Sequence, residues 1–179
     1  GVLLAARRRS VREFAEAKAQ LRHAAGHDAL TALMNRHGLQ TAGPTLLALA
    51  RRDARPVFAA FVDIDGLSTI NNTYGHGAGD EAIQTVAAAL VHAVREADIV
   101  SRWGGDEIVL VGIGEGPDAH RIEDAVREYA VRHTAVAGWD GQVSVGVTTL
   151  PSVDTTFDAL ILAADVAMYE RRSVRRGVA

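Results

Sequence analysis

The chain contains no cysteine, only four prolines and a single lysine, Lys18. The absence of cysteine excludes disulfides and thiolate metal sites, and it fits a reducing compartment such as the cytoplasm. The apolar run at the start, residues 1–6, is far shorter than the roughly 20 residues that span a bilayer. The net charge of -3 is small, which argues against nucleic acid or an anionic membrane as a partner.

What the chain does contain is typical of one globular domain. It has 179 residues, of which 48% are hydrophobic and 23% charged, enough to bury a sizeable core. Because Lys18 is the only lysine, any cation that binds phosphate in the rest of the chain has to be an arginine, whose planar fork differs from a compact ammonium.

Residues 1–26 predict a separate N-terminal helix, and residues 27–179 predict the main domain. Six positions of this helix recur at alternating spacings of three and four: Leu4, Arg7, Val11, Phe14, Lys18 and Leu21. This seam indicates either a short coiled-coil linker that pairs two chains or a helix packed on its own domain. The run Arg7–Arg9 fits either the cytoplasmic edge of a membrane helix or an ordinary charged helix.

Hydrophobic periodicity predicts alternating helices and strands in the main domain. We expect strands over 57–65, 98–103, 107–113 and 141–150. We expect helices from a cap at Asp28 or Thr31 to about Arg52, and over 66–73, 81–97, 118–134 and 156–172. Gly104 and Gly105 join two of the strands in a hairpin, so the fold class is α+β rather than a doubly wound parallel sheet.

Two pairs of acids lie at the ends of apolar strands. Asp63 and Asp65 end one strand and face the same side of it, because side chains alternate along a strand. Asp106 and Glu107 follow the two hairpin glycines. If the strands are neighbours, these carboxylates converge, and a divalent cation such as Mg²⁺ would relieve their repulsion. We assign Asp63 to the cation and Asp65 to capping the helix that begins at Gly66.

The segment 70–83 offers hydrogen-bonding groups for a purine. The carboxylate of Asp80 can accept from the N1–H and 2-amino groups of guanine, and the amide of Asn71 can read a base edge. These residue types also form turns and caps, so this signal is weak without the acid clusters.

Five stretches resemble the family of GGDEF-type diguanylate cyclase domains in their order and spacing: residues 28–36, 63–80, 102–108, 144–147 and 164–172. The resemblance implies a palm-like, mostly antiparallel five-stranded sheet flanked by helices and preceded by a signalling helix. It also implies a homodimer, each copy holding one GTP on Mg²⁺ or Mn²⁺, that forms cyclic di-GMP and releases pyrophosphate. A sensory or membrane region is expected upstream, with this domain in the cytoplasm.

The resemblance also assigns roles by position. Asp63, Asp106 and the Ile64 carbonyl correspond to metal ligands, Asp106 also to the proposed general base, and Glu107 to the adjacent acid. The substrate-binding positions are Gly66, Leu67, Asn71, His76, Asp80, Arg172 and Arg176. Arg95 and Asp98 form an R-x-x-D pair that binds the product and inhibits the enzyme in the family, although a salt-bridged helix end explains the same pattern.

Several positions depart from the family pattern. Leu67 and Asn72 replace a phenylalanine and a frequent aspartate, Arg175 replaces a glycine, and Arg172 and Arg176 occupy the places of a lysine and an arginine on the C-terminal helix. Ser68 stands where a lysine usually holds phosphate, Ile108 replaces a phenylalanine, and Ala32 replaces a glycine, which we expect to be tolerated only at negative φ. Ser68 leaves a second reading open, in which the domain binds GTP or cyclic di-GMP without turnover. A third reading is a related cyclase for another nucleotide, although Asp80 favours GTP.

Overall fold

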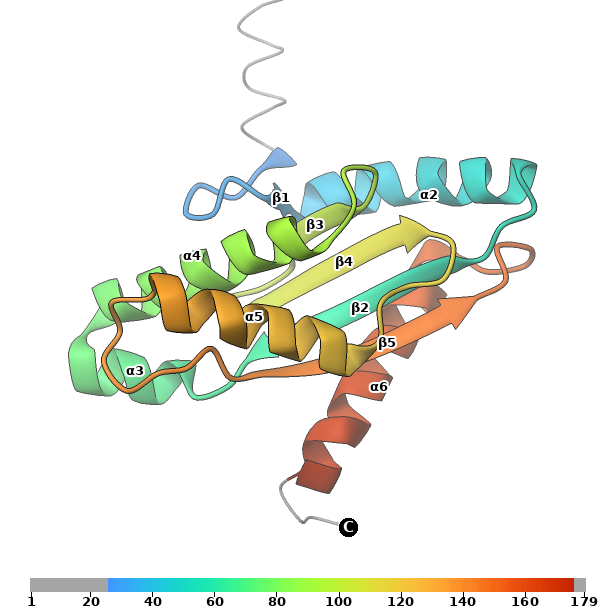
Figure 1. Cartoon of the computed structure of the whole chain (residues 1–179). Helices are drawn as coiled ribbons and strands as arrows, with labels where there is room; N and C mark the ends of the chain where they lie inside the picture. Colours follow the sequence, from blue (N-terminus) through green and yellow to red (C-terminus); the bar gives the residue numbers. More distant parts are fainter. Residues whose placement is uncertain (1–25, 176–179) are drawn as a thin grey trace, which may run out of the picture.

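A computed structural model of the chain describes residues 26–175, so nearly all of the predicted N-terminal helix lies outside the described part. A five-stranded sheet in the order β1-β3-β4-β2-β5 forms the centre (Figure 1). Its strands are β1 (Met34–Asn35), β2 (Val57–Ile64), β3 (Ile99–Arg102), β4 (Glu107–Ile113) and β5 (Val143–Leu150). Only β1 and β3 pair in parallel, and all other neighbours are antiparallel. The predicted α+β fold class is confirmed.

Helices cover both faces of the sheet. The helices are α2 (Arg36–Arg52), α3 (Leu67–Tyr74), α4 (His76–Ala93), α5 (Ala119–His133) and α6 (Phe157–Arg175). Helices α4 and α5 pack on one face, and α2 and α6 pack on the other. Because both faces are covered, every residue of the interior strand β2 is buried.

Strand β2 supplies alternate residues to two hydrophobic clusters. Phe58, Ala60 and Val62 point to the α4–α5 face, while Ala59 and Phe61 point to the α2–α6 face. The same alternation places Asp63 on the α2–α6 face, where β2 reaches the rim of the sheet. The predicted buried strand is therefore present, and its two faces determine what surrounds its terminal acid.

Several boundaries differ from the sequence prediction. Helix α4 begins at His76, so the glycine-rich segment expected as a loop is helical after Gly75. Helix α2 begins at Arg36, where Asn35 accepts from the N–H of Gly38 at 2.9 Å. Asp28 instead caps a turn, since its carboxylate accepts from the Thr31 N–H at 3.0 Å. Strand β1 was not predicted, because two residues carry no periodicity.

Ala32 has a φ of 57°, in the left-handed region, so the expectation of negative φ at this position was wrong. A left-handed conformation costs an L-residue with a Cβ about 1–2 kcal/mol. The turn between Asp28 and Leu33 holds it there, since the Ala32 N–H donates to the Asp28 carbonyl at 2.9 Å. Alanine is thus tolerated here at a cost in stability.

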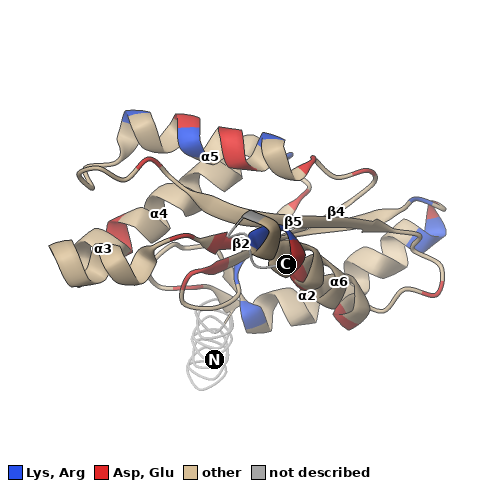
Figure 2. Ribbon diagram, turned by 90° about the horizontal axis from the view of Figure 1, so that it is seen from below, with Lys and Arg blue, Asp and Glu red and all other residues tan. Residues whose placement is uncertain are grey.

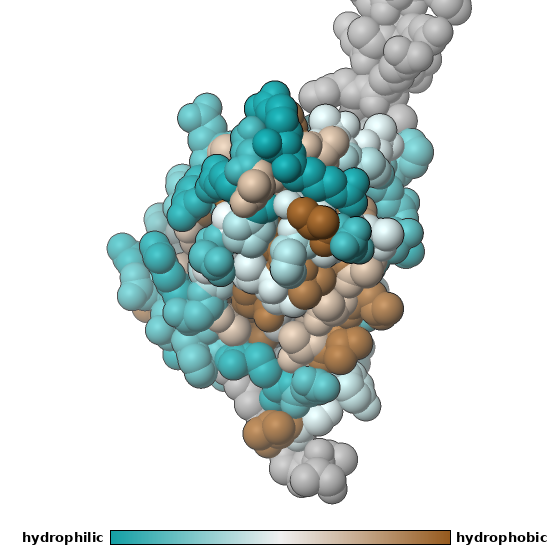
Figure 3. Space-filling model, turned by 90° about the vertical axis from the view of Figure 1, so that its right-hand side faces the viewer, coloured by the Kyte–Doolittle hydropathy of each residue, from teal (hydrophilic) through white to brown (hydrophobic). Residues whose placement is uncertain are grey.

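Within residues 26–175, no helix combines the length and hydropathy needed to cross a membrane. Some large hydrophobic side chains nevertheless remain at the surface, such as Val153 after β5, which is 62% exposed. The face shown in Figure 3 carries hydrophobic patches broken up by hydrophilic side chains. Scattered exposure of this kind is ordinary for a globular protein.

Candidate active site

The two acidic strand ends meet in the structure. Strand β4 pairs with β2 in a register that sets Glu107 directly opposite Asp63. The Ile64 N–H donates to the carbonyl of Asp106 at 3.1 Å, which fixes the hairpin tip to the end of β2. Side chains opposite each other in an antiparallel pair lie on the same face of the sheet. Asp63, Asp106 and Glu107 are therefore gathered at one rim, as the sequence predicted.

Burial and nearby negative charge disfavour the charged forms of Asp63 and Glu107. Asp63 is 7% exposed, and its burial raises its pKa. The neighbouring Arg172 lowers that pKa, Asp106 and Asp65 raise it again, and the net direction is upward. For Glu107, burial followed by Asp106, Asp63 and Asp165 raises the pKa, and Arg36 offsets only part of this. Crowded carboxylates that resist ionisation are typical of a site that receives a cation.

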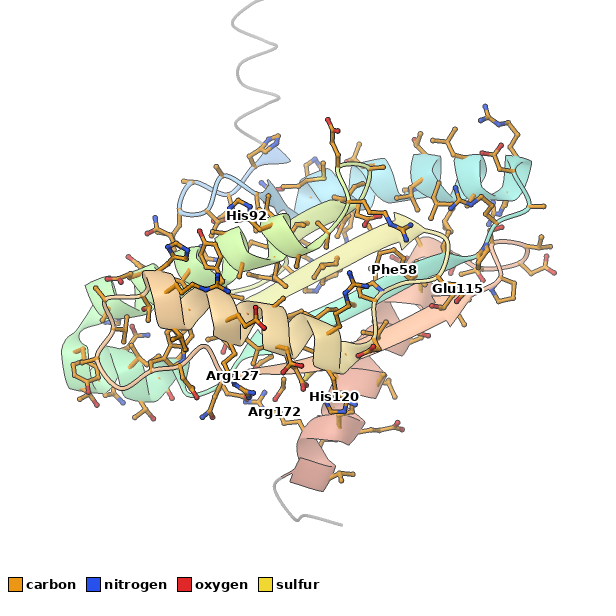
Figure 4. All side chains as sticks on the ribbon, in the orientation of Figure 1. Phe58, His92, Glu115, His120, Arg127 and Arg172 are labelled. Carbon is orange, nitrogen blue, oxygen red and sulfur yellow. The ribbon has the colours of Figure 1, made fainter. Side chains whose placement is uncertain are left out.

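Arg172 of α6 lies against the carboxylates of Asp63 and Asp65. Its NH1 is 2.8 Å from Asp63 Oδ1, and its NH2 is 3.6 Å from Asp65 Oδ1. Figure 4 shows the side chain at the lower edge of the sheet, and Figure 2 shows the basic segment of α6 beside the acidic ribbon at the end of β2. The predicted phosphate-binding arginine is thus next to the predicted metal ligands.

The predicted helix cap at Asp65 was wrong. Helix α3 has Gly66 as its N-cap, with a φ of 76° and no side-chain cap bond. The Asp65 carboxylate instead accepts from Ser144 Oγ of β5, at 2.9 and 3.0 Å to its two oxygens. This contact spans 79 residues of sequence, so local spacing could not reveal it.

Helices α3 and α4 form a corner around Gly75, and three predicted substrate-binding residues lie on it. Asn71 belongs to α3, whereas His76 and Asp80 belong to the first turns of α4. A Cβ at Gly79 would collide with Asn71 Oδ1, so the Asn71 amide packs directly against the backbone of α4. Asp80 and His76 are exposed. The corner thus gathers these polar groups on its surface.

Gly66 and Leu67 lie between this corner and the acids, at the N-terminal end of α3. Ser68 is exposed in the first turn of the same helix. The structure places Gly66 and Leu67 where their backbone N–H groups, which are free of intrahelical partners at a helix start, can meet phosphate. Arg176 lies outside the described residues.

Arg102 was not identified from the sequence, although it belongs to the motif 102–108. Its guanidinium donates to the carbonyl oxygens of Gly104 at 3.2 Å and Gly105 at 2.8 Å. It also donates to Asp28 Oδ1 at 3.1 Å. These contacts tie the hairpin tip to the turn before β1. In the sequence, the signal that could have identified Arg102 is its place two residues before the glycine pair.

Arg95 and Asp98 form a turn between α4 and β3. The Asp98 carboxylate accepts from the backbone N–H of Arg95 at 3.0 Å, and the Asp98 N–H donates to the Arg95 carbonyl at 3.0 Å. Both residues line a cavity of about 120 Å³ that also contains Phe58, Glu115 and Arg121. Figure 4 shows Phe58 and Glu115 at the far end of the sheet from Arg172. The R-x-x-D pair therefore lines a second hollow, separate from the acidic site.

A family model described as "Diguanylate cyclase, GGDEF domain" matches residues 25–177. The chain belongs to the GGDEF family. This GGDEF domain is 33% identical over 164 residues to diguanylate cyclase TpbB of Pseudomonas aeruginosa, covering 89% of the chain and 38% of that protein. It is 33% identical over 162 residues to diguanylate cyclase DosC of Escherichia coli, covering 87% of the chain and 34% of that protein. The chain thus spans well under half of these relatives.

Solved structures agree with the fold of this GGDEF domain. The GGDEF domain of TpbB (or YfiN) from P. aeruginosa superposes with a TM-score of 0.71 at 30% identity, covering 83% of this chain and 89% of that one. The coiled coil and GGDEF domain of DgcB from Caulobacter crescentus, in complex with c-di-GMP, gives a TM-score of 0.78 at 24% identity, with 97% and 93% covered. The predicted palm-like architecture is confirmed.

The oxygen donors of this GGDEF domain suit Mg²⁺. Within the described part of the chain, no three carboxylate or imidazole side chains form a metal-binding group. Mg²⁺ is usually held by one or two carboxylates together with substrate phosphates, rather than by a cage of protein ligands. Asp63 and Asp106, with a backbone carbonyl such as that of Ile64, fit that description. We would therefore expect the cation to need the nucleotide for a complete set of ligands.

Proposed function

We propose that this domain is a diguanylate cyclase that condenses two GTP molecules to cyclic di-GMP in the cytoplasm. The observation that carries the proposal is the Asp63–Glu107 pairing, with the Asp106 carbonyl bonded to the next residue of β2, Ile64, beside a helical corner of predicted substrate-binding residues. The names of the relatives as diguanylate cyclases support the same class of reaction.

Each residue then has a chemical task. Asp63, Asp106 and the Ile64 carbonyl would hold Mg²⁺ or Mn²⁺, which when bound supplies charge neutralisation at the phosphates and acidifies the attacking hydroxyl. Asn71 and Asp80 bind guanine, and His76 contacts the substrate beside them. Gly66, Leu67, Arg172 and Arg176 bind the triphosphate. Arginine replaces the usual lysine in this group.

In the reaction, the 3′-hydroxyl oxygen of one GTP attacks the α-phosphorus of the other. A phosphodiester bond forms, the bond to the β-phosphate oxygen breaks, and pyrophosphate leaves. Asp106 accepts the proton of the hydroxyl as general base, with Glu107 beside it. The same exchange occurs a second time to close the ring. Because each domain holds one GTP, we propose that a homodimer completes the active site.

We further propose that the cavity around Arg95 and Asp98 binds cyclic di-GMP as an inhibitor. The Arg95 guanidinium can fork onto phosphate or guanine, and Asp98 can accept from guanine N–H groups. Both residues line the hollow beside Arg121, and the Asp98 carboxylate accepts from the backbone N–H of Arg95, which supports this over a simple salt bridge. Product inhibition that is lost in Arg95→Ala would support the assignment.

The test is to incubate the protein with GTP and Mg²⁺ and to quantify cyclic di-GMP and pyrophosphate across a range of protein concentrations. The rate per mole should rise with concentration as dimers form, and ATP should give no product. Asp106→Asn should lower the rate by about 100-fold or more, the size expected for loss of a general base. A dimer that yields no product would contradict the proposal.

A non-catalytic domain that binds GTP or cyclic di-GMP is the second candidate, and the exposed Ser68 at the family's lysine position favours it. Calorimetry distinguishes the two functions. Tight nucleotide binding without turnover at high protein concentration would support the second.

A further inference from the structure

The Arg172 guanidinium lies against Asp63, which the proposed function assigns to a cation, and against the neighbouring Asp65. It is 2.8 Å from Asp63 Oδ1 and 3.6 Å from Asp65 Oδ1. The arginine side chain is 26% exposed and the Asp63 side chain 10%, so this ion pair is largely removed from water. Removing two opposite charges from water costs desolvation that their attraction offsets only in part, so a competing divalent cation can replace this pair.

The fold holds Arg172 against the sheet with little freedom. A Cβ at Gly146 of β5 would collide with the backbone N of Met168, so α6 lies directly on β5 at that point. Arg172 follows Met168 by one helical turn, on the same side of α6. The Ser144 hydroxyl, two residues before Gly146, orients the second acid, Asp65. Strand β5 therefore positions both members of the contact.

An arginine is chemically suited to this position. Its planar fork presents two N–H edges, one to each of two carboxylates, whereas a lysine ammonium is a point charge. The same fork suits the oxygens of a triphosphate. The guanidinium therefore has two alternative anionic partners, the acids and the nucleotide.

We infer that Arg172 is a positioning residue that serves as an internal counter-ion, neutralising Asp63 and Asp65 until nucleotide and divalent cation arrive together. The triphosphate then binds the guanidinium, and the Asp63 carboxylate becomes free for the cation. The inference rests on the proposed function for the identity of the triphosphate. It predicts that the nucleotide-free domain binds divalent cations weakly and that cation and nucleotide bind cooperatively.

The alternative is that Arg172 only ties α6 to the sheet. The two accounts predict opposite changes in cation affinity when Arg172 is replaced. A purely structural tie, when removed, loosens the site and weakens binding of both ligands. An internal counter-ion, when removed, strengthens binding of the cation alone and weakens binding of the nucleotide.

The experiment titrates Mn²⁺ into nucleotide-free protein and follows free Mn²⁺ by electron paramagnetic resonance. Arg172→Gln should bind Mn²⁺ about fivefold more tightly than the wild type, the upper end for a partly exposed ion pair. Arg172→Lys keeps the charge but loses the fork, and should give about a twofold gain. Arg171→Gln is the matched control, since it removes one positive charge from the adjacent residue, whose partner is Glu123 at 3.2 Å.

A second titration uses 3′-deoxy-GTP, which lacks the attacking hydroxyl, in the presence of Mg²⁺. Arg172→Gln should weaken its binding about tenfold, as for loss of a charge-assisted contact to phosphate. Mn²⁺ affinity that is unchanged or lower in both Arg172 variants, or raised equally in Arg171→Gln, would overturn the inference. Since the Mn²⁺ titration needs no GTP, a protein without cyclase activity that shows the gain would contradict only the proposed function.

Discussion

Asp63 and Glu107 face each other across the β2–β4 pair, and at the next position the carbonyl of Asp106 accepts from the Ile64 N–H at 3.1 Å. The acids are thereby anchored to the ladder of the sheet rather than to a mobile loop. A ladder keeps the carboxylates close although they repel one another. The repulsion is a stability cost that the rest of the fold has to offset.

Replacing one of these acids should therefore stabilise the protein while it removes activity. We expect Glu107→Gln, measured with EDTA present, to unfold at higher urea than the wild type at pH 7. The pKa of Glu107 is raised in the folded state, so its ionisation destabilises the fold above its ordinary value near 4.5, and the gain should disappear below that pH. Because the carboxylate is partly exposed, the gain should be on the order of 0.5 kcal/mol. A variant less stable than the wild type at pH 7 would contradict this account.

Gly146→Ala tests how α6 is positioned. The added methyl group meets the backbone of α6 at Met168, which has no side-chain freedom to yield. Overpacking of this kind costs about 1–3 kcal/mol, and we expect a matching fall in the free energy of unfolding. Moving α6 should also withdraw Arg172 and weaken GTP binding. Gly105→Ala, at a position with open space around the added Cβ, is the control for stability; an equal loss in both variants would count against the close-contact explanation.

Ala32→Gly should stabilise the domain. Glycine removes the strain of a φ of 57°, although the more flexible unfolded chain takes back part of the gain. We expect the free energy of unfolding, measured with urea, to increase by about 0.5–1 kcal/mol. The neighbouring Ala29, which lacks a positive φ, provides the comparison, because Ala29→Gly should be neutral or destabilising. Destabilisation by Ala32→Gly would show that the turn is not strained.

Asp28→Asn tests the link between the turn before β1 and the hairpin tip. Burial alone would raise the pKa of Asp28, but hydrogen bonds from Thr31 and Arg102 lower it below its ordinary value of 3.8. The charged carboxylate therefore stabilises the fold above about pH 4, and this contribution is lost as the pH falls through the folded pKa. The variant should be less stable than the wild type at pH 7, and the difference should shrink at pH 3. Equal differences at both pH values would exclude the ionic contribution.

The features that the sequence predicted well are those with local patterns. The apolar run before Asp63 and the hairpin glycines before Asp106 determined two strands, and their antiparallel pairing brought the acids together. The surrounding motifs then indicated the family. Strand ends and hairpins follow from short stretches of sequence, so this part of the site was predictable.

The errors arose where a distant residue decides the outcome. Asp65 was expected to cap the helix that follows it, but its carboxylate instead contacts Ser144 and Arg172. The glycine-rich segment after Gly75 has no helical pattern of its own, yet it is the start of α4, where Gly79 lies directly against the Asn71 side chain of α3. Tertiary contacts override local preference in both cases.

Because Asn71 and Gly79 are in close contact, substitutions at these two positions should have coupled effects. Any side chain at position 79 would displace the Asn71 amide; with the guanine contact proposed for Asn71, a substitution there would act on base recognition without touching the nucleotide. The two residues should therefore behave as one unit in a double-mutant cycle, with the second substitution costing little once the first is present.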